Sequence, residues 1–318
     1  MSALDVLKLC LVMLLWAICF PLITLGIQDA PHISFAALRA VIAGVALLAL
    51  AAFLGRPFPR GLRLWMSLLA IGVGATTFGF LGMFHAAEFV QPGAATVIAN
   101  TQPLVTAVLA GIFLAERSHT RVKIGLGIGF AGVVIIAAPA LLDDSQPSYA
   151  IGISYILLAA LGVACSNFLI KRIAHQTDAI MAMAIQLLLG AIPLGVWAIT
   201  TEDAGSITWS MRFVFSLASL SLLGTALVYC LWFRLIARLP LSRANAFSFL
   251  VPVIGLAMGA GFFGESIEWP HLVGLALTLL GVAMVVRADT PPISDPFNKI
   301  SPAPPAVERH AAGPEQEN

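Results

Sequence analysis

The sequence predicts an all-α integral membrane protein whose ten transmembrane helices form two inverted repeats of five helices each. Three observations lead to this prediction. Of the 318 residues, 59% are hydrophobic and only 10% are charged, and the mean hydropathy of +0.96 is far above that of a soluble domain. Prolines, glycines and acids recur at a fixed interval along the chain. Nearly all positive charge falls on one side of the predicted membrane.

The ten spans follow from the length of the apolar segments, because a hydrocarbon core of about 30 Å requires roughly 20 helical residues. We place them at residues 6–26, 32–54, 64–86, 93–115, 122–141, 150–171, 179–200, 212–235, 242–264 and 269–287. The first span resembles a signal peptide, but its charged region contains only Lys8 and no small-residue cleavage site follows, so we expect it to be retained. Residues 289–318 are rich in Pro, Ala, Glu and Ser and are predicted to form a disordered cytoplasmic tail.

The repeat is identified from residue types that have restricted positions in a membrane helix. Prolines, glutamates and glycines recur at a shift of 252 − 103 = 149 residues, which pairs Pro103 with Pro252, Glu116 with Glu265, Gly125 with Gly274 and Gly132 with Gly281. Agreement over about thirty residues indicates a duplication rather than a coincidence of composition. We therefore assign residues 1–144 to the first repeat and residues 145–288 to the second.

The distribution of Lys and Arg gives the orientation. Fifteen of the seventeen lie on one side, which the positive-inside rule assigns to the cytoplasm together with both termini. Because each repeat has an odd number of spans, the second enters the membrane upside down relative to the first. Such inverted repeats are typical of secondary transporters, whose substrate site lies near the midplane between the halves. We expect a multi-pass protein of the cytoplasmic (inner) membrane.

Other functions are disfavoured by composition and motifs. A net charge of +1 without a basic stretch argues against nucleic-acid binding. The four cysteines and six histidines are dispersed, and the chain has no HEXXH motif, nucleophile elbow or phosphate-binding loop, so we predict neither an enzyme nor a bound cofactor or metal. The alternative outside the transporter class is an integral-membrane enzyme acting on a lipid-linked substrate, which would need acids, His or Cys clustered near one interface.

Several motifs resemble one known family. They are Trp16 with Phe20 in span one, the Phe35–Arg39 segment in span two, the Pro103–Glu116 and Pro252–Glu265 stretches, and Asn167 with Phe168 in span six. In these residues the chain is similar to the ten-helix exporters of the drug/metabolite transporter superfamily, which are built from two EamA-type domains. The resemblance covers the ten spans and implies export of amino acids, their derivatives, nucleobase-like metabolites or drugs. Trp16 is followed by Ala17 where the family often has glycine, so we expect a more apolar lining from span one.

Nine side chains are predicted to contact the substrate: Trp16, Phe20, Arg39, Thr96, Asn100, Pro103, Asn167, Thr225 and Tyr229. Arg39 lies well inside span two, where an unpaired arginine costs about 2.5 to 3.5 kcal/mol on insertion scales. It either attracts a substrate carboxylate or holds helices together by donating to carbonyls that are free near a proline or a helix end.

Polar residues of span four share one helix face, because Thr96, Asn100 and Pro103 recur at i, i+4 and i+7. Pro103 would free a carbonyl near the midplane, beside an Asn100 amide that donates and accepts, which suits a neutral polar ligand. Asn100 would equally suit a bond to a neighbouring helix, and the same alternative holds for the buried amides Asn167 and Gln186.

Aromatic residues form two further faces. Trp16 and Phe20 share one face of span one, and Thr225, Tyr229 and Trp232 share one face of span eight. Such faces suit a flat or amphipathic solute. Trp232 lies near a span end, where we expect it to belong to an aromatic belt instead.

An amino acid or a derivative ranks first among substrates, because Arg39, the amides and the aromatics match a carboxylate, an amine and a side chain. A cationic or neutral drug-like solute is the alternative. No Asp or Glu lies deep in a span, which leaves facilitated diffusion, exchange or coupling through His85. The expected partners are a small-molecule substrate and the lipid bilayer. The glycine-rich spans five and ten either pack together within one molecule or form a homodimer contact.

Overall fold

The structure, a computed structural model, describes residues 1–86, 89, 99, 101–113, 120–141, 149–263 and 269–287. Within these ranges every regular element is a helix, and seven helices are long and apolar enough to cross a membrane. This agrees with the predicted all-α membrane class. The count of ten spans and their inversion stay predictions.

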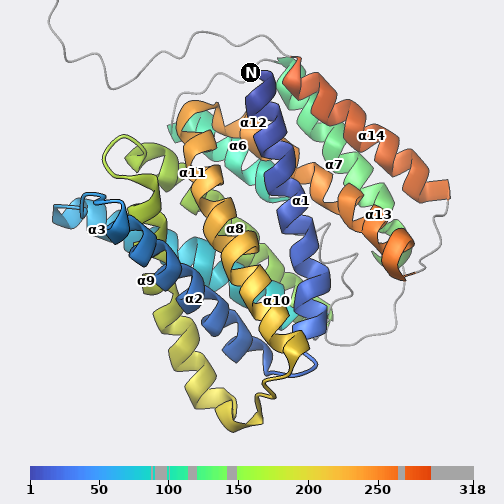
Figure 1. The fold of residues 1–318 in the computed structure, drawn as a ribbon. Helices are drawn as coiled ribbons and strands as arrows, with labels where there is room; N and C mark the ends of the chain where they lie inside the picture. The colour runs from blue at the N-terminus through green and yellow to red at the C-terminus, as the bar shows by residue number, and fades with distance from the viewer. Residues whose placement is uncertain are drawn as a thin grey trace, which may run out of the picture.

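The first half of the chain contains α1 (Ala3–Gly26), α2 (His32–Phe53), α3 (Leu62–Ile71), the π-helical η1 (Gly72–Phe78), α4 (Gly79–His85), α6 (Gln102–Phe113) and α7 (Thr120–Leu141). The second half contains α8 (Tyr149–Ile173), α9 (Ala179–Thr201), the 3₁₀ turn η3 (Ala204–Ser206), α10 (Met211–Ser221), the π-helical η4 (Leu222–Leu227), α11 (Val228–Arg238), α12 (Leu241–Ala246), the 3₁₀ turn η5 (Phe247–Phe249), α13 (Leu250–Phe263) and α14 (Trp269–Val286) (Figure 1). The predicted spans and these helices agree within a few residues at most ends.

Helix starts follow from capping side chains. Ser2 and Asp5 form a capping box at the start of α1. Asp178 accepts from the backbone N–H of Ile180 and Met181 and so begins α9. Ser210 caps α10 in the same way. Polar caps at these points satisfy backbone donors where each chain segment enters the apolar bundle.

The position of Pro103 differs from the prediction. Because α6 begins at Gln102, Pro103 lies in the first turn, where its missing N–H has no intrahelical acceptor to serve. The interpretation of Pro103 as a proline in the middle of a helix is therefore wrong, and the free carbonyl near the midplane stays a prediction. Thr96 and Asn100, predicted to share its face, lie outside the described residues.

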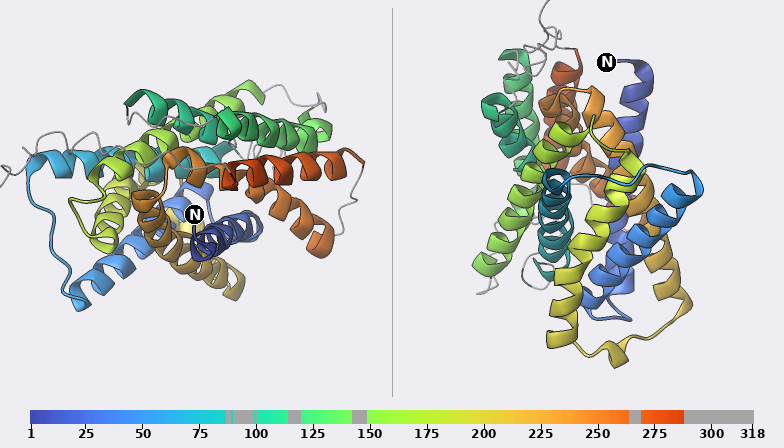
Figure 2. Two further views of the ribbon diagram at one scale, coloured as in Figure 1. Left: turned by 90° about the horizontal axis from the view of Figure 1, so that it is seen from above. Right: turned by 90° about the vertical axis from the view of Figure 1, so that its left-hand side faces the viewer.

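Two helix pairs approach each other closely at glycines. In α2, a Cβ at Gly44 would lie 2.8 Å from the Leu188 side chain of α9, which would have to shift. In α7, a Cβ at Gly125 would lie 2.8 Å from the Gly281 carbonyl oxygen of α14. Figure 2 shows α7 and α14 side by side along one edge of the bundle. Of the two alternatives for the glycine-rich helices, the structure has them packed within one molecule, and the homodimer stays a prediction.

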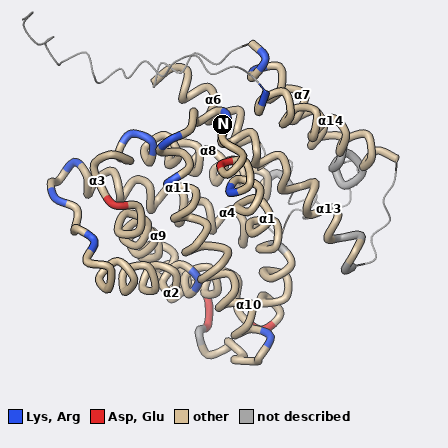
Figure 3. The backbone as a smooth tube through the Cα atoms, turned by 45° about the horizontal axis from the view of Figure 1, so that its top comes forward, with Lys and Arg blue, Asp and Glu red and all other residues tan. Residues whose placement is uncertain are grey.

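The surface of the bundle suits a bilayer. Large apolar side chains such as Ile112, Ile192, Ile199 and Phe215 are more than half exposed on the outside of their helices. An apolar exterior of this kind is unusual for a soluble monomer and is expected where lipid replaces water. Figure 3 shows Lys and Arg mostly near the ends of the helices. The core between α1, α2, α9 and α11 contains Met13, Leu47, Leu187 and Phe233.

Candidate functional site

Arg39 is buried between the two halves of the chain, with 2% of its surface exposed. It comes from α2, and its Nε donates to Thr225 Oγ1 of η4 at 2.8 Å. Its Nη2 donates to the Gly224 carbonyl oxygen at 3.4 Å and lies 3.6 Å from Cys19 Sγ of α1. The guanidinium carbon lies 4.6 Å from the centroid of the Phe80 ring, a cation–π distance. We call these five residues the arginine cluster.

The local geometry of η4 builds the acceptor side of this cluster. The Thr225 hydroxyl donates to the Leu220 carbonyl oxygen at 2.8 Å, so its lone pairs face the Arg39 Nε–H. A Cβ at Gly224 would lie 2.6 Å from Cys19 Sγ, so glycine is required for α1 to approach η4. π-helical turns are rare and are frequent at functional sites, since they expose backbone groups that an α-helix would use internally.

One nitrogen of the guanidinium has no partner. Arg39 Nη1 is buried and makes no hydrogen bond within the described residues. A buried donor without an acceptor costs about 1 to 3 kcal/mol, and more when the group is charged. The bonds to Thr225 and Gly224 agree with the interpretation that Arg39 holds helices together. They leave the two N–H groups of Nη1 for an external acceptor.

A second polar group is built around Asn245 of α12. Its Oδ1 accepts from Gln102 Nε2 at 2.7 Å and from Asn167 Nδ2 at 3.1 Å, while its Nδ2 donates to the Leu241 carbonyl oxygen. Asn167 Oδ1 accepts from Trp232 Nε1 at 2.8 Å. The amide network is the set of Gln102, Asn167, Trp232 and Asn245, and it joins four helices from both halves.

Two helices connect the arginine cluster with the amide network. On α1, Trp16 precedes Cys19 by three residues, and its ring centroid lies 5.2 Å from that of Trp232. On η4 and α11, Thr225, Tyr229 and Trp232 follow each other at i, i+4 and i+7, a rise of about 10 Å. Arg39, the aromatic side chains and the amide network thus follow one another along α1 and along the η4–α11 helix.

The predicted site residues fall into three groups. Arg39 and Thr225 are hydrogen-bonded to each other, and Asn167 lies in the amide network. Trp16 packs at a tilt against Trp232 of that network, and Tyr229 is half-buried between the arginine cluster and the amide network. Pro103 is buried beside Gln102 at the start of α6. Thr96, Asn100 and the side chain of Phe20 lie outside what the structure describes.

Two residues of the network, Gln102 and Asn245, were not predicted from the sequence, and a third, Trp232, was misjudged. Trp232 is 5% exposed and hydrogen-bonded to Asn167, so its expected place in an aromatic belt is wrong. Asn245 was not predicted, although a signal existed, because 245 − 149 = 96 makes it the repeat counterpart of Thr96. Gln186 is buried and accepts from Thr76 Oγ1 of η1 at 2.9 Å, which gives it a helix-tying role.

The amide network is expected to be energetically coupled. A double-mutant cycle of Asn245→Ala and Gln102→Ala, measured by thermal unfolding in detergent, should give a coupling free energy of about 0.6 kcal/mol and at most about 1.7 kcal/mol, the range found for interhelical hydrogen bonds in membranes. A cycle of Asn245→Ala with Gln186→Ala is the control, because Gln186 bonds elsewhere, and should be additive. Zero coupling in the first cycle would contradict the 2.7 Å bond.

Comparison with known proteins identifies the family. The sequence pattern of the EamA-like transporter family matches residues 4–138 and again residues 150–287. A protein described as a probable amino-acid metabolite efflux pump from Salmonella typhimurium is 30% identical over 293 residues, which cover 89% of this chain and 94% of the relative. The Escherichia coli protein of the same description is 29% identical over 292 residues.

Two further comparisons agree with the family match. A WAT1-related chloroplastic protein of Arabidopsis thaliana is 30% identical over 258 residues, and the match covers 79% of this chain and 61% of that relative's length. A solved crystal structure superposes with a TM-score of 0.78 over 90% of this chain and 99% of its own, at 18% sequence identity, which shows a shared fold. The chain carries two EamA domains in a multi-pass membrane protein and belongs to the EamA-like transporter family.

Proposed function

We propose that the chain is a secondary transporter that exports an amino acid or an amino-acid derivative across the cytoplasmic membrane, with both termini in the cytoplasm. It works by alternating access between two inverted five-helix repeats. The family match supports the transporter class, and the names of the two bacterial efflux pumps support this kind of substrate.

The helical bounds support the repeat. The shift of 149 residues carries the start of α7 onto that of α14, since 269 − 120 = 149. It also carries Thr76 of η1 onto Thr225 of η4, and the two π-helical segments coincide to within one residue. Two rare helical irregularities at equivalent positions are expected of a duplicated unit. With five spans in each unit, the second is inverted and the substrate site lies between the halves.

A helix that is interrupted by a 3₁₀ turn supports the same location of the substrate site, between the two halves. In the second half, α12 ends at Ala246, the 3₁₀ turn η5 follows, and α13 begins at Leu250. Asn245 is the last but one residue of α12. Transporter sites near the midplane are typically formed by interrupted helices, whose free backbone groups face the substrate.

The observation that carries the substrate class is that Arg39 Nη1 has no hydrogen-bond partner in the part of the chain that the structure describes. A carboxylate is the acceptor that matches its two N–H groups best, through charge-assisted hydrogen bonds. A buried cation repels a cationic solute, which disfavours the cationic form of the drug-like alternative. The aromatic rings and amides beyond Arg39 then bind the rest of the amino-acid substrate.

The test is uptake of labelled amino acids into proteoliposomes that contain the purified protein. Each transported amino acid is competed with its own methyl ester and its own amide, which keep the side chain and lose the carboxylate. We expect the ester and the amide to compete at least tenfold more weakly, because the charge-assisted bonds are worth about 1.5 to 3 kcal/mol each.

Each alternative has its own outcome. Equal competition by the ester, the amide and the free acid would show that the transporter does not recognise the carboxylate of the substrate. Saturable uptake of neutral drug-like solutes, with none of any amino acid, would replace the proposed substrate class by the alternative. Protein-free vesicles are the control for passive diffusion.

A further inference from the structure

Two acid–arginine pairs lie at opposite ends of the bundle and are related by the repeat. Asp29 comes shortly before α2 and Arg63 shortly after it, and the 22 residues of α2 span about 33 Å. In the same way, Asp178 directly precedes α9 and Arg212 follows it. The shift of 149 residues carries Asp29 onto Asp178, since 178 − 29 = 149, and the same shift carries Arg63 onto Arg212. Each arginine is the second residue of its helix, α3 or α10, so the local settings correspond as well.

The first pair is formed at the end of the bundle where α2 and α10 begin, which we call the α10 end. Arg212 binds Asp29 in a bidentate manner, because its Nε donates to Oδ2 at 2.8 Å and its Nη2 donates to Oδ1 at 2.7 Å. Gln28 Oε1 accepts from the remaining nitrogen, Nη1, at 2.7 Å. The Ser210 hydroxyl and the Thr208 N–H also donate to Asp29, each at 2.7 Å. The bonds from Arg212 and Ser210 hold the pKa of Asp29 below its usual range, so its carboxylate is ionised at neutral pH.

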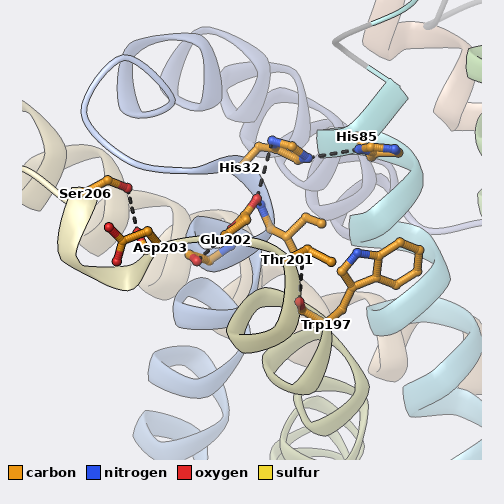
Figure 4. A network of polar contacts seen from close by, with 9 residues as sticks. His32, His85, Trp197, Thr201, Glu202, Asp203 and Ser206 are labelled. Carbon is orange, nitrogen blue, oxygen red and sulfur yellow. Dashed lines mark hydrogen bonds and ion pairs between the residues drawn. The ribbon is translucent and has the colours of Figure 1, made fainter.

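Glu202, the residue after α9, adds a second contact between the halves at the α10 end. Figure 4 shows it beside His32, the first residue of α2, whose Nδ1 lies 3.5 Å from Glu202 Oε1. The start of α2 has no side-chain cap of its own, and Glu202 accepts instead from the N–H of Ile33 at 2.9 Å and from that of Ser34 at 2.7 Å. A carboxylate at a helix N-terminus is also favoured by the helix dipole. Because Glu202 caps α2, both carboxylate oxygens of Asp29 are left for other donors.

The second pair is separated at the opposite end, where α3 and α9 begin, which we call the α3 end. Asp178 uses Oδ1 to cap α9, accepting from the N–H of Ile180 at 2.9 Å and from that of Met181 at 3.2 Å. Its Oδ2 lies 3.7 Å from Arg56 Nη1, which is longer than a hydrogen bond. Arg63 is exposed and makes no ion pair among the residues that the structure describes. One pair is thus formed while its repeat counterpart is apart.

Asp178 is nevertheless able to bind a guanidinium from α3. The α3 helix, which begins one residue before Arg63, packs against α9. The contact with Arg56 shows that Asp178 Oδ2 is accessible to an arginine, since 40% of the Arg56 side chain and 17% of the Asp178 side chain are exposed. Arg63 is therefore placed to reach the same oxygen when the starts of α3 and α9 approach each other.

We infer that the two pairs are gates that alternate. Inverted repeats exchange their arrangements during transport, so that one end of the molecule closes as the other opens. In this structure the pair of Asp29 and Arg212 holds the α10 end closed. When this pair separates, Arg63 binds Asp178 and closes the α3 end. The role in transport rests on the proposed function, under which the α10 end is the outer end, whereas the exchange of the two pairs is a property of the fold.

Distances between spin labels at the two ends are the first measurement, because they need no substrate. They are measured by pulsed electron paramagnetic resonance on purified protein. The labels are placed at four exposed positions that the repeat shift also relates: Ile27→Cys with Trp209→Cys at the α10 end, and Gln176→Cys with Arg60→Cys at the α3 end. The native cysteines that are not fully buried are first replaced: Cys10→Ser, Cys165→Ser and Cys230→Ser. The two label pairs then report on equivalent places in the two repeats.

Arg212→Ala is expected to lengthen the distance at the α10 end and to shorten the distance at the α3 end, each by at least about 5 Å, the rise of one helical turn. Asp29→Asn keeps the size of the side chain and removes its charge, so it should give both shifts as well. Adding Arg63→Ala to Arg212→Ala should abolish the shortening and keep the lengthening. Unchanged distances in both single variants, or lengthening at the α10 end alone, would overturn the alternating gates.

Substrate counterflow in proteoliposomes is the second measurement. Arg212→Ala and Arg63→Ala are each expected to lower the rate at least about fivefold, the lower end of typical coupling between sites, because each variant removes the arginine of one gate. Arg60→Ala is the matched control, since Arg60 is exposed, lies three residues before Arg63 and belongs to neither pair. Its counterflow rate should equal that of the wild type.

The outcomes separate the gates from the proposed function. Counterflow at the wild-type rate in Arg63→Ala would overturn the gate at the α3 end and leave the proposed function standing. If the wild type shows no counterflow of any amino acid, the proposed function fails, and the label distances still decide whether the two pairs alternate.

Discussion

Arg39→Ala is expected to lower the rate of amino-acid transport at least a hundredfold. The variant removes the buried guanidinium and with it the two N–H groups of Nη1, which have no hydrogen-bond partner among the described residues. Two charge-assisted hydrogen bonds of about 1.5 to 3 kcal/mol each account for this loss. Arg39→Lys keeps the charge and should still lose at least tenfold, because an ammonium cannot bind Thr225 and a carboxylate with the geometry of the planar fork.

Two controls make this result interpretable. Arg60→Ala removes an exposed arginine near the start of α3 and should leave transport unchanged. Thr225→Val keeps the guanidinium and removes the hydroxyl that orients it, so we expect a raised KM with folded protein. Normal transport by Arg39→Ala would remove Arg39 from the substrate site. Loss of folded protein in Arg39→Ala, with unchanged transport in Thr225→Val, would assign Arg39 to helix packing alone.

Gly125→Leu is expected to destabilise the protein severely, whereas Gly127→Leu two positions along the same helix should have little effect. A Cβ at Gly125 would lie 2.8 Å from the Gly281 carbonyl oxygen and 2.9 Å from the Val285 side chain of α14, so a leucine forces the helices apart. Overpacking costs about 1 to 3 kcal/mol for small groups, and a whole leucine against backbone exceeds that range. At Gly127 no atom lies within 4 Å of an added Cβ.

Thermal unfolding of both variants in the same detergent is the measurement, with the difference between them as the quantity of interest. The two substitutions have the same helix propensity and the same hydrophobicity, so only the packing differs. Similar midpoints for Gly125→Leu and Gly127→Leu would contradict the close approach of α7 and α14. Gly281→Ala provides a second test from α14, since its Cβ would lie 2.5 Å from the Gly125 carbonyl oxygen.

The membrane class was predictable because it depends on composition and on apolar length, which tertiary contacts do not change. Arg39 was predictable for a related reason, since a cation inside an apolar span is costly wherever its partners lie. Thr225 was found through its helix face. Its π-helical surroundings were not, because the sequence of η4 carries no signal that distinguishes a π turn from an α turn.

The amide network was only partly predictable. Asn245 lies 143 residues from Gln102 and 78 from Asn167, and no local pattern says that these amides meet. Trp232 was misjudged because its position in the span suggested an interface, while its partner came from another helix. The contact between His32 and Glu202 is equally long-range. Pro103 was misjudged although Asn100, Thr101 and Pro103 itself are residue types that are common at a helix start.

The contact between α2 and η4 has a counterpart in which α9 holds η1, but the chemistry of the two differs. One is an arginine on Thr225 and the other is an amide, Gln186, on Thr76. In a transporter with two identical halves, exchanging the roles of the halves would not change the free energy. Its inward-facing and outward-facing states would therefore be equally populated. Of these two described contacts, only the one between α2 and η4 contains a charged side chain. In the alternating access proposed above, the two facing states would therefore differ in free energy even without substrate, and the substrate-free protein would favour one of them.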